Sequence, residues 1–176
     1  MTGEQDTTLG ALKTALKMEI DGKEYYLKAA KASQNPLGKN LLEKLAAEED
    51  IHRQGFEKIY KDISASQAWP EKAFKGDGGS SLRTVFARAL KTLDKDAKTL
   101  ASEMDAIQTA MTMENRTYDF YRSRSGKAGY PAEKQFYEEL AMQEEEHHRV
   151  LLDYYEYLKN PAAWFVQKEH HSLDGG

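Results

Sequence analysis

The chain has 176 residues and a mass of 20.0 kDa, which is enough for one domain to bury a core without disulfides. Charged residues make up 31%, hydrophobic residues make up 40%, and the net charge of −4 comes without a basic cluster, so we expect a soluble helical protein that does not bind nucleic acid. The absence of cysteine excludes disulfides, zinc ribbons and rubredoxin-type centres from these residues, and the absence of a long apolar run or an apolar leader favours a cytoplasmic protein without a membrane span.

Proline and glycine divide the chain into four long segments that we expect to be helices. Thr7 or Thr8 can cap the first segment. Asn35 followed by Pro36 is typical of an N-cap with proline in the first turn of a helix, and it begins the second segment. The expected helices cover about residues 7–33, 36–63, 102–125 and 131–159.

A crossover of about residues 64–101 separates the two pairs of helices, and its residues 82–93 have the pattern of a short amphipathic helix. The turns within each pair are short, so each pair forms an antiparallel hairpin. Two hairpins joined by one long crossover make an all-α four-helix bundle, which we expect over about residues 7–159, with the whole chain forming a single domain.

The two halves of the chain repeat one pattern with a constant shift of 95 residues. Each half supplies one isolated glutamate, then a tyrosine seven residues later, then a Glu-x-x-His. Glu145 and His148 form a further Glu-x-x-His that the repeat does not select, and we expect them to face solvent. The repeated positions are Glu19/Glu114, Tyr26/Tyr121, Glu49/Glu144 and His52/His147.

The repeated glutamates and histidines fall on the apolar sides of their helices, where Lys23 is the one misfit. In a hairpin with a rise of about 1.5 Å per residue, they also reach one level of the bundle. Burying even one unpaired carboxylate costs several kcal/mol, and four would repel one another, so we expect two divalent cations to neutralise them. Mixed glutamate and histidine ligation suits iron or manganese. The predicted metal ligands are Glu19, Glu49, His52, Glu114, Glu144 and His147.

The combined pattern resembles that of the rubrerythrin-like branch of the ferritin-like di-iron carboxylate proteins, of the erythrin type that lacks a rubredoxin domain. Its marks are Glu-x6-Tyr in the first and third bundle helices and Glu-x-x-His in the second and fourth, and the likeness covers residues 7–159. The resemblance implies a ferritin-like antiparallel bundle that binds two iron ions, with a manganese or mixed pair as the alternative. It also implies bridging by Glu49 and Glu144. Glu19 would be terminal on the metal bound by His52, and Glu114 on the metal bound by His147.

The same resemblance implies a di-iron peroxidase or oxidase that reduces hydrogen peroxide or dioxygen during oxidative stress, with Tyr26 and Tyr121 beside the metals. Two departures from the family pattern affect this expectation. Thr117 stands where rubrerythrins usually carry a further glutamate, and the missing cysteines leave electron delivery to a separate donor protein. We expect a homodimer.

Two alternative functions stay open from the sequence. One is ferritin-like iron binding and storage, which needs a multi-subunit shell or a separate shell that encloses the protein. The other is a structural metal-binding bundle without turnover. The tail, residues 160–176, contains His170 and His171, which we do not assign as ligands.

Overall fold

The computed structural model describes residues 3–66, 69–70, 82 and 101–166, and this part of the chain contains helices and no strand. The long helices are α1 (Gly3–Ala32), α2 (Pro36–Ser66), α4 (Ala101–Gly126) and α5 (Pro131–Lys159). They agree within a few residues with the four predicted helices, so the all-α ferritin-like bundle is confirmed. The crossover lies outside the described residues except for positions 64–66, 69–70, 82 and 101.

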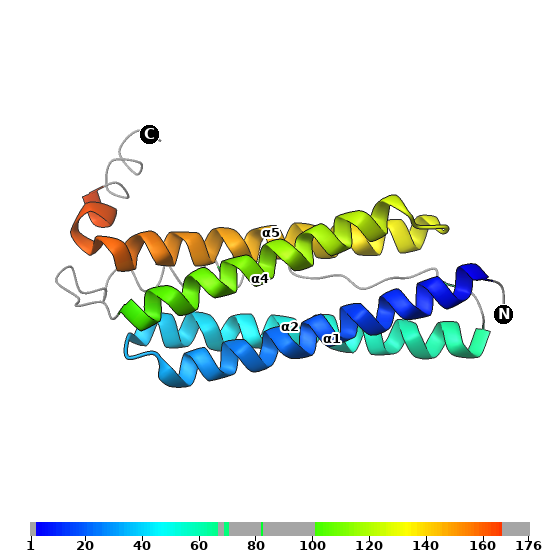
Figure 1. Ribbon diagram of the computed structural model, residues 1–176, viewed down its shortest axis with the longest axis horizontal. Coiled ribbons are helices and arrows are strands. Elements are labelled where there is room, and N and C mark those ends of the chain that lie inside the picture. Colours follow the sequence, from blue (N-terminus) through cyan, green and yellow to red (C-terminus); the bar gives the residue numbers. More distant parts are fainter. Residues whose placement is uncertain (1–2, 67–68, 71–81, 83–100, 167–176) are drawn as a thin grey trace.

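The four helices form two antiparallel hairpins that lie against each other (Figure 1). In each hairpin the two helices pack along their length, α1 against α2 and α4 against α5, while α1 also contacts α4 and α2 contacts α5. The N-terminal end of α1 lies at the same end of the bundle as the turn between α4 and α5 (Figure 1). In the described ranges no helix has an apolar stretch long enough to cross a bilayer.

Local sequence explains where α2 begins. The Asn35 side-chain Oδ1 accepts hydrogen bonds from the backbone N–H of Leu37 at 2.9 Å and of Gly38 at 3.4 Å. These bonds satisfy amides that have no partner within the first turn, so the predicted cap is confirmed.

The beginning of α1 differs from the prediction, because the helix starts at Gly3 and contains both Thr7 and Thr8. A threonine cap stabilises a helix by only about 1 kcal/mol, which does not prevent the preceding residues from continuing it.

Two apolar clusters fill the bundle on either side of one level. The first cluster includes Tyr26, Leu45, Ile107 and Leu151. The second includes Leu12, Phe56, Tyr121 and Leu140. On every one of the four helices, the predicted metal ligands lie in sequence between the residues of the two clusters. The level between the clusters is therefore closed off by apolar side chains at both ends.

Beyond α5 the chain forms one more helical segment at residues 161–166, where we expected only a tail. Trp164 and Phe165 from this segment are buried in the first cluster, and the Trp164 indole N–H donates to Asp153 Oδ1 at 3.1 Å. Leu82 of the crossover is also buried there. The rest of the predicted crossover helix, together with His170 and His171, lies outside the described residues.

Candidate metal centre

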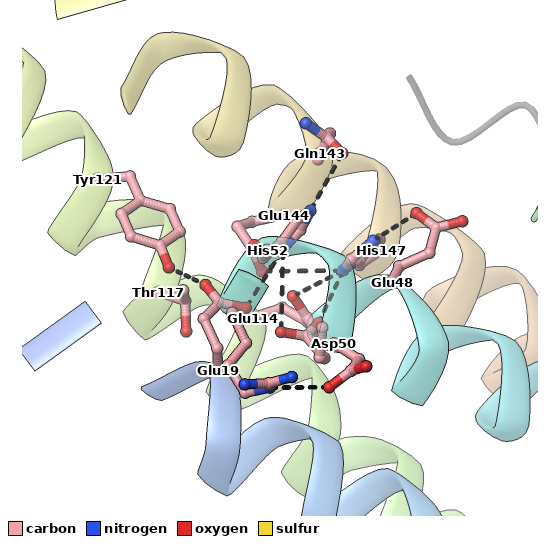
Figure 2. A network of polar contacts seen from close by, with 12 residues as sticks. Glu19, Glu48, Asp50, His52, Glu114, Thr117, Tyr121, Gln143, Glu144 and His147 are labelled. Carbon is pink, nitrogen blue, oxygen red and sulfur yellow. Dashed lines mark hydrogen bonds and ion pairs between the residues drawn. The ribbon is translucent and has the colours of Figure 1, made fainter. Parts of the chain in front are cut away.

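All six predicted ligands meet at the level between the two apolar clusters, and Figure 2 labels each of them except Glu49. None of them is more than 3% exposed, although the set contains four carboxyl groups. One isolated glutamate comes from α1 and one from α4, while α2 and α5 each supply a Glu-x-x-His. The residues are Glu19, Glu49, His52, Glu114, Glu144 and His147.

These residues form two groups that are each compact enough to surround one metal ion. The first consists of Glu19, Glu49, His52 and Glu144, and the second of Glu49, Glu114, Glu144 and His147. Within each group one ligand atom per residue lies within 4.8 Å of all the others. Glu49 and Glu144 belong to both groups, which is the division expected of two bridging and two terminal carboxylates.

Both imidazole rings direct Nδ1 at the carboxylates. His52 Nδ1 lies 3.2 Å from Glu19 Oε2 and 3.3 Å from Glu144 Oε1. His147 Nδ1 lies 3.2 Å from Glu49 Oε1 and 3.5 Å from Glu114 Oε2. The rings are stacked, with centroids 5.6 Å apart and an angle of 12° between their planes.

Several buried polar atoms of this cluster lie close to an oppositely charged group but make no hydrogen bond of normal geometry, although buried polar atoms in folded proteins are nearly always hydrogen-bonded. These atoms are Glu49 Oε1, Glu114 Oε2, Glu144 Oε1 and His147 Nδ1. All four belong to the predicted ligands, and carboxylate oxygen with imidazole nitrogen is a donor set typical of dinuclear sites in helical bundles. The residues present therefore fit a pair of divalent cations.

The pKa values of the four carboxyl groups diverge. Burial raises the pKa of Glu49 and Glu144 well above the ordinary value, and the neighbouring carboxylates raise it further. Burial acts in the same direction on Glu19 and Glu114, but the charge and hydrogen bond of the adjacent histidine outweigh it. The pKa of Glu19 is lowered, and that of Glu114 falls to about 2.

The pKa values of both histidines are raised, because the nearby carboxylates outweigh the effect of burial. Burial lowers the pKa of His52, but the charges of Glu19 and Glu49 more than compensate and bring it to about 9. The pKa of His147 is raised well above its ordinary value, mainly by Glu114 once burial is overcome. Without metal, protons held by the two histidines and by the shared glutamates thus offset part of the negative charge of the cluster. The charge balance that protons provide in this state is one that two divalent cations can replace.

The two predicted tyrosines lie beside the cluster and bind across the bundle. The Tyr26 hydroxyl donates to Glu114 Oε1, and the Tyr121 hydroxyl donates to Glu19 Oε1. Each tyrosine thus bonds to the isolated glutamate of the other hairpin. Burial and the nearby carboxylates raise the pKa of both hydroxyls well above the ordinary value, so they remain protonated donors.

Two further polar residues contact the site, and the sequence analysis did not identify them. Gln143 Oε1 lies 3.1 Å from His52 Nε2, and Glu48 Oε2 lies 3.1 Å from His147 Nε2 (Figure 2). The sequence repeat could have identified these two positions, because positions 48 and 143 are also separated by 95 residues and each directly precedes a shared glutamate.

The structure also shows the surroundings of three other residues that the sequence analysis singled out. Lys23 is partly exposed, and its Nζ pairs with Asp50 Oδ1 at 2.7 Å, so its charge is satisfied at the edge of the bundle. The Thr117 hydroxyl donates to the Met113 carbonyl at 3.1 Å. Glu145 is exposed, as expected for a residue that the repeat does not select.

Comparison with known proteins agrees with this geometry. A family model described as Rubrerythrin matches residues 10–155, a range that includes all six clustered residues. Searches of curated proteins and of solved structures gave no match. Because the family match spans most of the chain, the protein belongs to the rubrerythrin family of di-iron carboxylate proteins.

Proposed function

We propose that this protein is a non-haem di-iron oxidoreductase that reduces hydrogen peroxide or dioxygen with electrons from a separate donor. The observation that carries the proposal is the pair of compact ligand groups sharing Glu49 and Glu144 inside the bundle. A structural cation would need only one such group, whereas two groups with common carboxylates suit a coupled pair of ions. When bound, two iron ions would supply two electrons at adjacent positions.

In this proposal each residue has a stated part. Glu19 and His52 would hold one ion, Glu114 and His147 would hold the other, and Glu49 and Glu144 would be shared between them. The six residues would set the charge of the site, while the apolar clusters at both ends exclude bulk water. The metals, when bound, would supply the redox chemistry.

The tyrosines would position the terminal carboxylates and keep a proton close to them. Each hydroxyl already donates to one oxygen of Glu19 or Glu114, which leaves the second oxygen directed at the cluster. Burial and the nearby carboxylates raise the pKa of each hydroxyl in the metal-free protein, so both tyrosines carry the proton that they donate to the terminal carboxylates.

In this proposal a small oxidant approaches the cluster on the side next to α1, where Gly22 carries no side chain. A Cβ atom added at Gly22 would be in van der Waals contact with the shared carboxylate, 3.4 Å from Glu49 Oε2. Glycine therefore hinders the approach of hydrogen peroxide or dioxygen less than any other residue would at this position. The 176 residues contain no cysteine and hold no rubredoxin-type centre, so in this proposal the electrons reach the site from a donor outside these residues.

The test is stopped-flow absorbance of the reduced, iron-loaded protein mixed with peroxide or with dioxygen. We expect the wild-type protein to be oxidised at least tenfold faster than Glu49→Ala, while Glu145→Ala, an exposed control on α5, keeps the wild-type rate. Equal rates for wild type and Glu49→Ala would contradict the proposal. Metal that stabilises the fold without any oxidation would instead indicate a structural site.

A further inference from the structure

We propose that Glu48 and Gln143 make the two metal positions inequivalent, so that the position at His147 binds a divalent cation more tightly than the position at His52. This inference rests on the dinuclear site of the proposed function. It concerns two residues that do not belong to the ligand set, and it assigns them a positioning role toward the histidines.

The two residues occupy equivalent places. Each directly precedes a shared glutamate, Glu48 on α2 and Gln143 on α5, and each reaches across to the histidine of the opposite hairpin. Both contacts go to the Nε2 side of the ring at 3.1 Å, and Figure 2 shows the two side chains on the outer sides of the imidazoles.

The tautomer of a metal-bound histidine then fixes the direction of these hydrogen bonds. Nδ1 of both rings faces the carboxylates, so a ring that binds metal through Nδ1 carries its proton on Nε2 and donates it outward. His147 donates to a carboxylate oxygen and His52 to an amide oxygen. A charged acceptor makes the stronger hydrogen bond and gives the imidazole more basic character, which strengthens its bond to a cation.

Burial keeps this difference from being screened by water. Glu48 is 8% exposed and Gln143 is 5% exposed. The orientation of the Gln143 amide is also fixed, because its Nε2 donates to the Glu139 carbonyl at 3.4 Å while Oε1 faces His52. The amide therefore presents an acceptor to the ring but adds no negative charge.

The ligands and the two tyrosines are matched in residue type between the two halves. The four repeated pairs of glutamates, histidines and tyrosines are identical in residue type, and the two tyrosine hydrogen bonds are equivalent. Gly22 and Thr117 also differ, but the Thr117 hydroxyl is bonded to the Met113 carbonyl. The contacts at Nε2 thus give the two positions a difference in both charge and hydrogen-bond strength.

The experiment is an anaerobic titration of the metal-free protein with Co²⁺, followed by hyperfine-shifted NMR signals of the two imidazole N–H protons. His52→Ala and His147→Ala assign the signals. At one equivalent of Co²⁺ we expect the His147 signal to exceed the His52 signal by about tenfold, the lower end of the effect seen for such partners of metal-bound histidines.

Three nearly isosteric variants separate the contributions. Glu48→Gln and Gln143→Glu each equalise the two acceptors, so the occupancy ratio should approach one. The double variant Glu48→Gln/Gln143→Glu exchanges them and should favour His52. Glu43→Gln, an exposed change of the same charge on α2, should keep the wild-type ratio. Circular dichroism of each variant verifies that the bundle is intact.

The outcomes distinguish this inference from the proposed function. Binding of fewer than two Co²⁺ ions per wild-type chain would contradict the dinuclear site itself. Binding of two ions with an occupancy ratio near one, or a ratio that the double variant does not reverse, would overturn the inference and leave the dinuclear site standing.

Discussion

The Tyr26 hydroxyl donates a hydrogen bond to the Glu114 carboxylate, although the two residues are 88 positions apart in the chain. The equivalent bond joins Tyr121 to Glu19, so each hairpin supplies the donor for the isolated glutamate of the other. This exchange links the assembly of the bundle to the geometry of the site, because neither terminal carboxylate is fixed until both hairpins are in contact.

Tyr26→Phe and Tyr121→Phe should each destabilise the metal-free protein by about 1–2 kcal/mol, because a buried carboxylate oxygen loses its donor while the ring packing is kept. Urea unfolding in the presence of chelator measures this change. Tyr130→Phe, at a half-exposed position, is the matched control and should change the free energy of unfolding by less than about 0.5 kcal/mol. An equally small effect at all three positions would contradict the role of the cross-hairpin bonds.

Substitution of a shared glutamate should remove more bound metal than substitution of a terminal glutamate. Glu49→Gln or Glu144→Gln takes a charged donor from both groups, so iron retained after anaerobic loading and desalting should fall from about two ions per chain to below one. Glu19→Gln affects one group only and should leave about one ion. Metal analysis of these variants, with Glu145→Gln as control, makes the comparison. Retention of two ions by Glu49→Gln would show that this residue is not shared.

The metal-free protein should lose stability as the pH rises from about 6.5 to 9. The pKa of His52 is about 9 in the folded protein, compared with 6.5 for an unperturbed histidine. Between these values the folded chain holds a proton that the unfolded chain has released, so stability falls with rising pH. The raised pKa values of Glu49 and Glu144 act in the same direction above about pH 4.5.

Thermal melts in chelator at pH 6.5, 7.5 and 9 test this, and the melting temperature should decrease across the series. Metal affinity should change in the opposite direction, since cations displace these same protons, so the stabilisation by metal should grow as the pH rises. A metal-free protein whose melting temperature increases over this range would contradict the upward pKa shifts of His52, Glu49 and Glu144.

Gly38→Ala should destabilise the end of the bundle next to the first turn. The added Cβ would clash with the Tyr154 hydroxyl and lie 2.8 Å from Glu103 Oε1, two groups that hydrogen-bond to each other. Forcing this partly buried pair apart should lower the free energy of unfolding, measured in urea, by about 2 kcal/mol. Gly10→Ala is the control, because nothing lies within 4 Å of its Cβ and alanine stabilises a helix by up to about 1 kcal/mol. Equal effects of the two substitutions would refute the clash.

The sequence predicted the helices and the six clustered residues because both depend on periodic patterns. The 95-residue repeat distinguishes Glu144 and His147 from their neighbours, and distances from the turns place them at the level of Glu49 and His52. The helix face of a residue and its level along the bundle do not specify which side chains meet across the bundle. Those contacts depend on how one hairpin packs against the other. For this reason the cross-hairpin tyrosine bonds, the Asp50 partner of Lys23 and the contacts of Glu48 and Gln143 emerged only from the structure.

The most direct test of the account is the position of metal in the protein itself. Crystals of the protein loaded anaerobically with Fe²⁺, measured at the iron absorption edge, should give two anomalous peaks per chain. Each should lie against both Glu49 and Glu144, one beside His52 and the other beside His147. A single peak, or peaks only at other positions while these side chains remain buried, would contradict the dinuclear site.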